Sequence, residues 1–125
     1  MIAADASTWI AFLEGETAPD TELLGQALRD RQVLMVPVVL TELLSDPKLS
    51  AEVATTLCDL PPIEIGREYW RRAGALRAKV LAKRRRARPG DALIAQCCID
   101  GGVSLLTRDR DFRAFSEAAG LKLVV

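Results

Sequence analysis

Short apolar segments alternate with longer amphipathic segments along the whole chain. The short segments are almost wholly apolar, which is typical of strands buried on both faces of a parallel sheet. The longer segments repeat their apolar residues at helical spacing. This alternation predicts an α/β fold with right-handed crossovers, in which a central, mostly parallel, five-stranded sheet lies between layers of helices.

The boundaries of these segments follow from the apolar pattern and from proline and glycine. The predicted strands are residues 2–4, 34–36, 63–65, 104–106 and 121–124. The predicted helices are residues 7–14, 21–31, 38–45, 49–59, 67–86, 92–99 and 112–119. Pro61-Pro62 and Gly101-Gly102 each precede a predicted strand, and Gly120 ends the last predicted helix.

The length of 125 residues predicts one domain spanning 1–125, with enough apolar content for a single core. No apolar segment is long enough to span a bilayer, and no basic start precedes a long apolar stretch. The three cysteines are odd in number and lack the spacing of a zinc site. We therefore expect a soluble, cytoplasmic protein with reduced thiols and no membrane partner.

Three acidic residues follow the ends of predicted strands or begin predicted helices. Asp5 comes directly after the first strand, Asp109 follows the fourth, and Asp91 begins a helix after Pro89-Gly90. Ligands of open parallel sheets bind beyond the carboxyl ends of the strands, where such residues would converge. Taken singly, each aspartate also suits a helix N-terminus, and capping is the simpler interpretation of Asp91 and Asp109.

Glu42 does not fit the capping interpretation. It lies within a predicted helix, flanked by Leu40 and Leu43, so we expect largely apolar surroundings. An unpaired carboxylate buried there would cost on the order of several kcal/mol, which a shared cation would offset. The alternative is that Glu42 lies on an exposed stripe of its helix.

The chain contains no histidine, which excludes Ser-His-Asp and Cys-His mechanisms. Clustered carboxylates repel one another unless a cation lies between them, and hard oxygen ligands favour Mg²⁺ or Mn²⁺. Metal-activated water attacking phosphorus is the chemistry that remains. Ser7 and Thr107 would orient the carboxylates, and Asp111 is an alternative to Asp109 as the fourth acid.

Charge is strongly segregated although the net charge is zero. Residues 1–66 hold three basic and eleven acidic residues, whereas residues 67–88 hold ten basic residues and one acid. Such a basic run suits a phosphate backbone, although a solvated helix face is the commoner reason for one. The candidate residues for binding RNA or a protein partner are Lys83, Arg84, Arg85, Arg86 and Arg88.

Four segments together resemble the PIN-domain ribonucleases, in particular the VapC-type toxins of type II toxin–antitoxin pairs. Residues 2–10 are similar to the family's first-strand motif, with an aspartate, then a serine two residues later and then an isoleucine. Residues 37–43 resemble its glutamate-bearing helix and residues 91–95 its third acidic motif. Residues 105–112, with 120–123, resemble its ending. The resemblance covers essentially the whole chain.

The resemblance implies an endoribonuclease that requires Mg²⁺ or Mn²⁺ and hydrolyses RNA phosphodiester bonds. Asp5 and Asp91 would be the principal metal ligands, and Glu42 and Asp109 would hold a second ion or orient the water. It also implies a small antitoxin that inhibits the site, a homodimer, and higher hetero-oligomers with the antitoxin.

Two other classes fit part of the pattern. The first is an α/β phosphatase or phosphotransfer domain with an acidic Mg²⁺ site, but position 7 is serine where a dehalogenase-like motif has a second aspartate. The second is an inactive PIN-like binding module whose acids only cap helices. The presence of all four acids argues against this second class.

Overall fold

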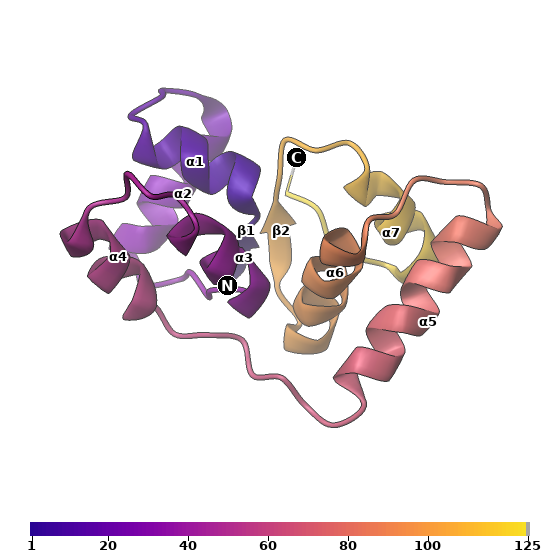
Figure 1. Ribbon diagram of the computed structural model, residues 1–125. Helices are drawn as coiled ribbons and strands as arrows, with labels where there is room; N and C mark the ends of the chain where they lie inside the picture. The colour runs from indigo at the N-terminus through magenta and orange to yellow at the C-terminus, as the bar shows by residue number, and fades with distance from the viewer. Residues whose placement is uncertain (125) are drawn as a thin grey trace.

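The computed structural model describes residues 1–124, and its centre is a pair of short parallel strands. Strand β1 (Ile2–Ala4) pairs with β2 (Ser104–Leu106), so that Ile2 lies opposite Ser104 and Ala4 opposite Leu106 (Figure 1). The predicted α/β fold with parallel pairing is therefore confirmed. Because both strands run in the same direction, the residues after Ala4 and Leu106 emerge at the same edge.

Three more extended segments flank this pair through isolated parallel bridges. Ile2 bridges Val33, Met35 bridges Pro62, and Leu105 bridges Leu123. Within residues 1–124, however, only β1 and β2 form a continuous ladder, so the predicted five-stranded sheet is not confirmed. Pro62 has no N–H group to donate, which limits pairing at its segment.

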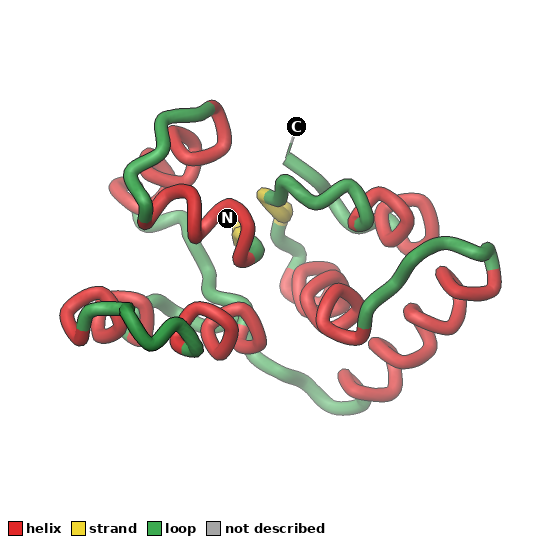
Figure 2. The backbone as a smooth tube through the Cα atoms, turned by 45° about the horizontal axis from the view of Figure 1, so that its top comes forward, coloured by secondary structure: helices red, strands yellow, loops and turns green. Residues whose placement is uncertain are grey.

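Helices cover the strands on both sides. Figures 1 and 2 show α1 to α4 on one side of the strand pair and α5 to α7 on the other. The helices are α1 (Ala6–Leu13), α2 (Pro19–Arg29), α3 (Pro37–Leu44), α4 (Ala51–Cys58), α5 (Tyr69–Ala82), α6 (Pro89–Gly101) and α7 (Phe112–Ala119). Each lies close to its predicted range except α5. Proline in the first turn of α2, α3 and α6 fixes where these helices begin.

Residues 83–86, in the last part of the basic run, lie outside the helix that the sequence predicts for them. Helix α5 ends at Ala82, whereas the sequence predicted a helix through residue 86. Arg84 adopts a left-handed φ of 56°, and the N–H of Arg85 bonds to the carbonyl of Val80 at 3.3 Å. This is the hydrogen-bonding pattern of a Schellman C-terminus, which ends the helix. Residues 83–88 therefore form a loop between α5 and α6.

The core packs against both faces of the strands. Ala3, Leu105 and Phe115 are fully buried in it, together with Trp9 from α1 and Val39 from α3. Burial of the strand residues holds the β1 and β2 ends in place, because shifting either strand would expose this apolar set. Among the described residues, no helix combines the length and apolar character needed to cross a bilayer.

Candidate metal centre

Asp5 anchors the site at the end of β1. Its side chain caps α1, where Oδ1 accepts hydrogen bonds from Ser7 Oγ at 2.6 Å and from the Thr8 N–H at 3.3 Å. The residue is only 5% exposed. Its N–H donates to the carbonyl of Leu106 at 3.0 Å, so the strand pairing itself fixes the position of the carboxylate.

Thr107 joins the ends of the two strands. Its hydroxyl donates to Asp5 Oδ2 at 2.6 Å and accepts the N–H of Asp109 at 3.0 Å. Asp109 Oδ1 in turn accepts the N–H of Asp111 at 2.9 Å. The predicted roles of Ser7 and Thr107 in orienting carboxylates have direct geometric support, because both hydroxyls donate to Asp5.

Asp91 lies in the first turn of α6 and faces the other aspartates. One carboxylate oxygen from each of Asp91, Asp109 and Asp111 lies within 4.8 Å of the other two. The Asp91 side chain is 13% exposed, and its Oδ2 is buried without a hydrogen-bond partner. Burial raises the pKa of Asp91, and the negative charge of Asp109 raises it further.

Glu42 lies on α3 and, among the described residues, is not one of the three acids whose carboxylate oxygens lie within 4.8 Å of one another. The residue is exposed, so the predicted burial in apolar surroundings is wrong. Partial desolvation of its carboxyl group nevertheless raises its pKa, and the charges of Asp5 and then Asp91 raise it further. The charges of both aspartates therefore act on Glu42.

The donor set fits a divalent cation. The carboxylates of Asp91, from α6, and of Asp109 and Asp111, from the loop after β2, converge, and each added negative charge opposes ionisation of its neighbours. The unpartnered Oδ2 of Asp91 is a buried acceptor that a cation would satisfy. Hard oxygen ligands favour Mg²⁺ or Mn²⁺. Asp109 and Asp111 both lie in the cluster, so the choice between them as fourth acid stays open.

The basic loop lies beside this cluster. The guanidinium of Arg88 is 4.0 Å from Asp91 Oδ2 and 3.9 Å from both Asp109 and Asp111. Arg86 is 3.6 Å from Asp111. These distances are long for ion pairs, and the Arg88 side chain is 59% exposed. Arg86 and Arg88 therefore lie at the rim of the acidic cluster, within reach of any phosphate bound there.

The rest of the loop is farther from the acids. Arg85 pairs with Glu117 on α7 at 2.8 Å, with both side chains substantially exposed. Lys83 and Arg84 form no ion pair within residues 1–124. The five predicted basic residues thus divide into two at the rim of the cluster and three along the outer part of the loop.

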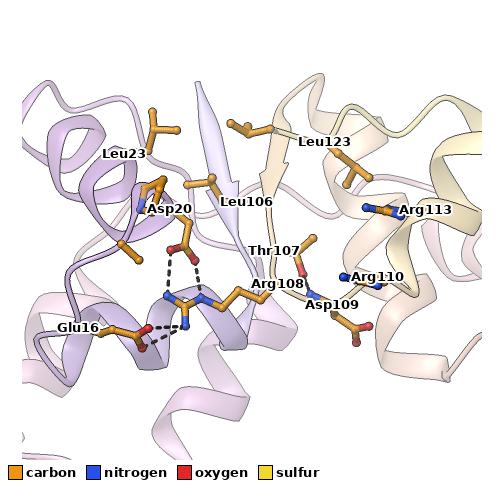
Figure 3. Close-up of a pocket in the computed structure, with 13 residues that line it drawn as sticks. Glu16, Asp20, Leu23, Leu106, Thr107, Arg108, Asp109, Arg110, Arg113 and Leu123 are labelled. Atoms are coloured by element: carbon orange, nitrogen blue, oxygen red, sulfur yellow. Dashed lines mark hydrogen bonds and ion pairs between the residues drawn. The ribbon is translucent and has the colours of Figure 1, made fainter.

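A second ionic cluster braces the loop after β2, and the sequence did not predict it. Figure 3 shows Arg108 between Asp20 and Glu16: its guanidinium contacts both oxygens of Asp20 at 2.7 and 3.0 Å and both of Glu16 at 3.0 and 3.1 Å. The hydrogen bond from Arg108 lowers the pKa of Asp20. The Arg108 N–H also donates to Ser7 Oγ at 3.0 Å. Arg108 therefore connects the segment before α2 to the residues that orient Asp5.

We expect Thr107→Val to weaken both the fold and the cation site. The variant leaves Asp5 Oδ2 and the Asp109 N–H without their partner, at a cost of about 1–3 kcal/mol in the free energy of unfolding. Mn²⁺ affinity should fall by about 10–100-fold, as for other groups that orient metal ligands. Urea unfolding and calorimetric titration measure the two effects. Thr107→Ser keeps the hydroxyl and is the matched control, so equal losses in both variants would contradict this role.

The sequence matches a known family, and the fold is similar to solved structures. The model of the PIN domain family matches residues 2–118. The fold is similar to the crystal structure of VapBC2 from Rickettsia felis bound to a DNA fragment from their promoter, with a TM-score of 0.74 and 20% identity over 99% of this chain and 98% of that one. It is also similar to VapBC-5 from Mycobacterium tuberculosis, described as a member of the VapBC family of toxin–antitoxin systems, with a TM-score of 0.67 and 22% identity over 98% and 96% of the two chains. No curated protein sequence matches the chain significantly.

Proposed function

The chain belongs to the PIN domain family, and on that premise we propose that it is a metal-dependent endoribonuclease, the toxin of a toxin–antitoxin pair. The observation that carries the proposal is the convergence of Asp91, Asp109 and Asp111 next to Asp5 and Glu42, with one buried oxygen of Asp91 unpartnered. The toxin role is supported by similarity in fold to two structures of VapBC systems.

The proposed roles of the acids follow from their positions. Asp5 and Asp91 are the principal ligands, because they are the most buried of the acids and their backbones are fixed by the β1 end and the first turn of α6. Glu42 and Asp109 hold a second ion or orient the attacking water. A bound Mg²⁺ or Mn²⁺ would polarise the phosphodiester and make the attacking water more acidic.

Other residues keep these carboxylates in place. Ser7 and Thr107 donate to opposite oxygens of Asp5 and so restrict its rotation. Arg86 and Arg88, at the rim of the cluster, are placed to attract the phosphates of an RNA strand toward the acids. The proposal that the substrate is RNA rests on membership of the PIN domain family.

The proposal includes a protein partner and a compartment. A small antitoxin would inhibit the enzyme by covering the acidic site, and the antitoxin's identity is open. The free thiols Cys97 and Cys98 are buried, as suits a protein of the reducing cytoplasm. The homodimer expected from the resemblance, and its larger assemblies with antitoxin, stay predictions.

Brief induced expression in bacteria, followed by sequencing of RNA 5′ ends, tests the toxin proposal. Wild-type protein should stop growth and produce new ends at a recurring site, because cleavage needs the intact acidic cluster. Asp5→Asn keeps an acceptor for capping α1 but removes the charge, so it should do neither. Glu52→Gln, an exposed acid on α4, is the matched control and should behave as wild type. Identical new ends from wild type and Asp5→Asn would contradict the proposal.

A further inference from the structure

A cleft of about 550 Å³ opens beside the acidic cluster (Figure 3). Thr107 and Asp109 line it, and the same two residues belong to the hydrogen-bonded chain that reaches Asp5. The cleft and the acidic cluster therefore share Asp109. A strand of RNA whose phosphate lies at the acids would have its neighbouring nucleotide beside this cleft.

One wall of the cleft has its charges already paired. Glu16 and Asp20 line this wall, and Arg108 forms two hydrogen bonds with each of them. Thr8 donates a further hydrogen bond to Asp20 at 3.1 Å. Two carboxylates and one guanidinium leave this wall with one net negative charge, which the hydrogen bonds from Arg108 and Thr8 hold in place.

The opposite wall carries two arginines from the start of α7. Figure 3 shows Arg110 and Arg113 on the side of the cleft away from Asp20 and Glu16. Both residues are exposed, and neither forms an ion pair with a carboxylate anywhere in residues 1–124. This wall is therefore available to bind an anion.

Apolar side chains complete the cleft between the two walls. Leu23 from α2, Leu106 from β2 and Leu123 from the last extended segment contribute to its lining. The combination of two exposed guanidinium groups with an apolar surface suits a ligand that carries both phosphates and flat apolar rings. Single-stranded RNA has this chemistry, since its bases are unpaired and can pack against protein side chains.

We propose that this cleft is a nucleotide subsite for single-stranded RNA, in which Arg110 and Arg113 bind phosphates and Leu23 and Leu123 contact a base next to the cleaved bond. The subsite rests on the proposed endoribonuclease function and names the form of RNA that the same site takes. It does not require recognition of a particular base, because phosphate contacts position a strand without reading its sequence.

Binding of a fluorescently labelled single-stranded RNA of 12 nucleotides in EDTA tests the subsite without turnover. For the double variant Arg110→Gln/Arg113→Gln we expect the Kd for RNA to rise about tenfold. The slope of log affinity against log salt concentration should become shallower by about 0.7 for each phosphate that the variant no longer binds. Arg110→Lys/Arg113→Lys keeps the charge and should recover most of the affinity. Arg29→Gln/Arg31→Gln, at the far end of α2, removes the same charge elsewhere and should bind as wild type.

The outcomes separate the subsite from the proposed function. An unchanged Kd and salt slope in Arg110→Gln/Arg113→Gln, with native melting behaviour, would overturn the subsite. The RNA subsite would also be overturned if Arg110→Gln/Arg113→Gln weakened the binding of an acidic, leucine-containing peptide but not the binding of RNA. That result would assign the cleft to a protein partner. RNA cleavage by the wild type is measured separately with Mg²⁺. If Arg110→Gln/Arg113→Gln binds RNA more weakly but the wild type does not cleave RNA, the subsite is supported and only the endoribonuclease function is contradicted.

Discussion

Replacing Asp91 with asparagine is expected to reduce RNA cleavage by on the order of a thousandfold or more. The asparagine side chain has nearly the same shape but carries no charge, so it cannot provide the same ligand to a divalent cation. Among the described residues, Asp91 is the acid with a buried oxygen that has no hydrogen-bond partner, its nearest cation being the Arg88 guanidinium at 4.0 Å. Its function is therefore separable from folding, because that oxygen makes no hydrogen bond that the substitution would remove.

The same substitution is expected to stabilise the metal-free protein. Burial and the charge of Asp109 raise the pKa of Asp91 above its ordinary value of 3.8, so the folded state binds this proton more tightly than the unfolded state does. The wild type accordingly loses stability as the pH rises from 3.8 through the raised pKa. Asp91→Asn avoids that loss, so its advantage in free energy of unfolding should grow across this window and then level off.

Urea unfolding in EDTA between about pH 3.5 and about pH 8, together with cleavage assays, measures both effects. Asp59→Asn, an exposed aspartate at the end of α4, is the matched control and should change neither. A variant at Asp91 that cleaves RNA at the wild-type rate would remove this residue from the site. A variant that is inactive but clearly less stable at neutral pH would point to a structural role instead.

The order of helices and extended segments was predictable from the apolar pattern, but the extent of the sheet was not. Only the first and fourth predicted strands pair as a ladder, whereas the segments around residues 33–35, 62 and 123 are joined through three isolated parallel bridges. Whether a segment forms a ladder depends on partners distant in sequence, such as Met35 and Pro62. Local hydrophobicity contains no information on such pairing.

Three acids of the site were predictable because strand ends in a parallel sheet share an edge. Asp5 and Asp109 are joined through Thr107 as that argument requires. The burial of Glu42 was predicted wrongly because apolar neighbours in sequence do not fix the phase of a helix. Leu43 is buried, whereas Leu44 is 41% exposed, so the apolar run of α3 extends onto its solvent side.

The brace around Arg108 was not predictable from the sequence. Its partners Glu16 and Asp20 lie about ninety residues away along the chain and carry no motif. The helix end at Ala82 was also missed, because arginine is an ordinary helix former and only the backbone shows the left-handed conformation of Arg84. Both features depend on tertiary contacts that a single sequence does not reveal.

Removing divalent cations is expected to abolish cleavage and to lower the melting temperature of the wild type. A cation bound to the folded state stabilises it by mass action, and it also removes the repulsion among Asp91, Asp109 and Asp111. Mg²⁺ or Mn²⁺ added back should restore cleavage and raise the melting temperature. Asp91→Asn should show a much smaller rise, since it lacks one of the proposed principal ligands.

The central claim is that these carboxylates form one cation site that cleaves RNA. The most direct test is the cleavage rate of a labelled RNA as Mn²⁺ is titrated into protein first stripped of metal, for wild type and Asp91→Asn in parallel. We predict no cleavage without Mn²⁺, a saturable rise for the wild type and a flat line for Asp91→Asn. Full cleavage by the wild type in EDTA, or an Asp91→Asn curve that overlays the wild type, would contradict the claim.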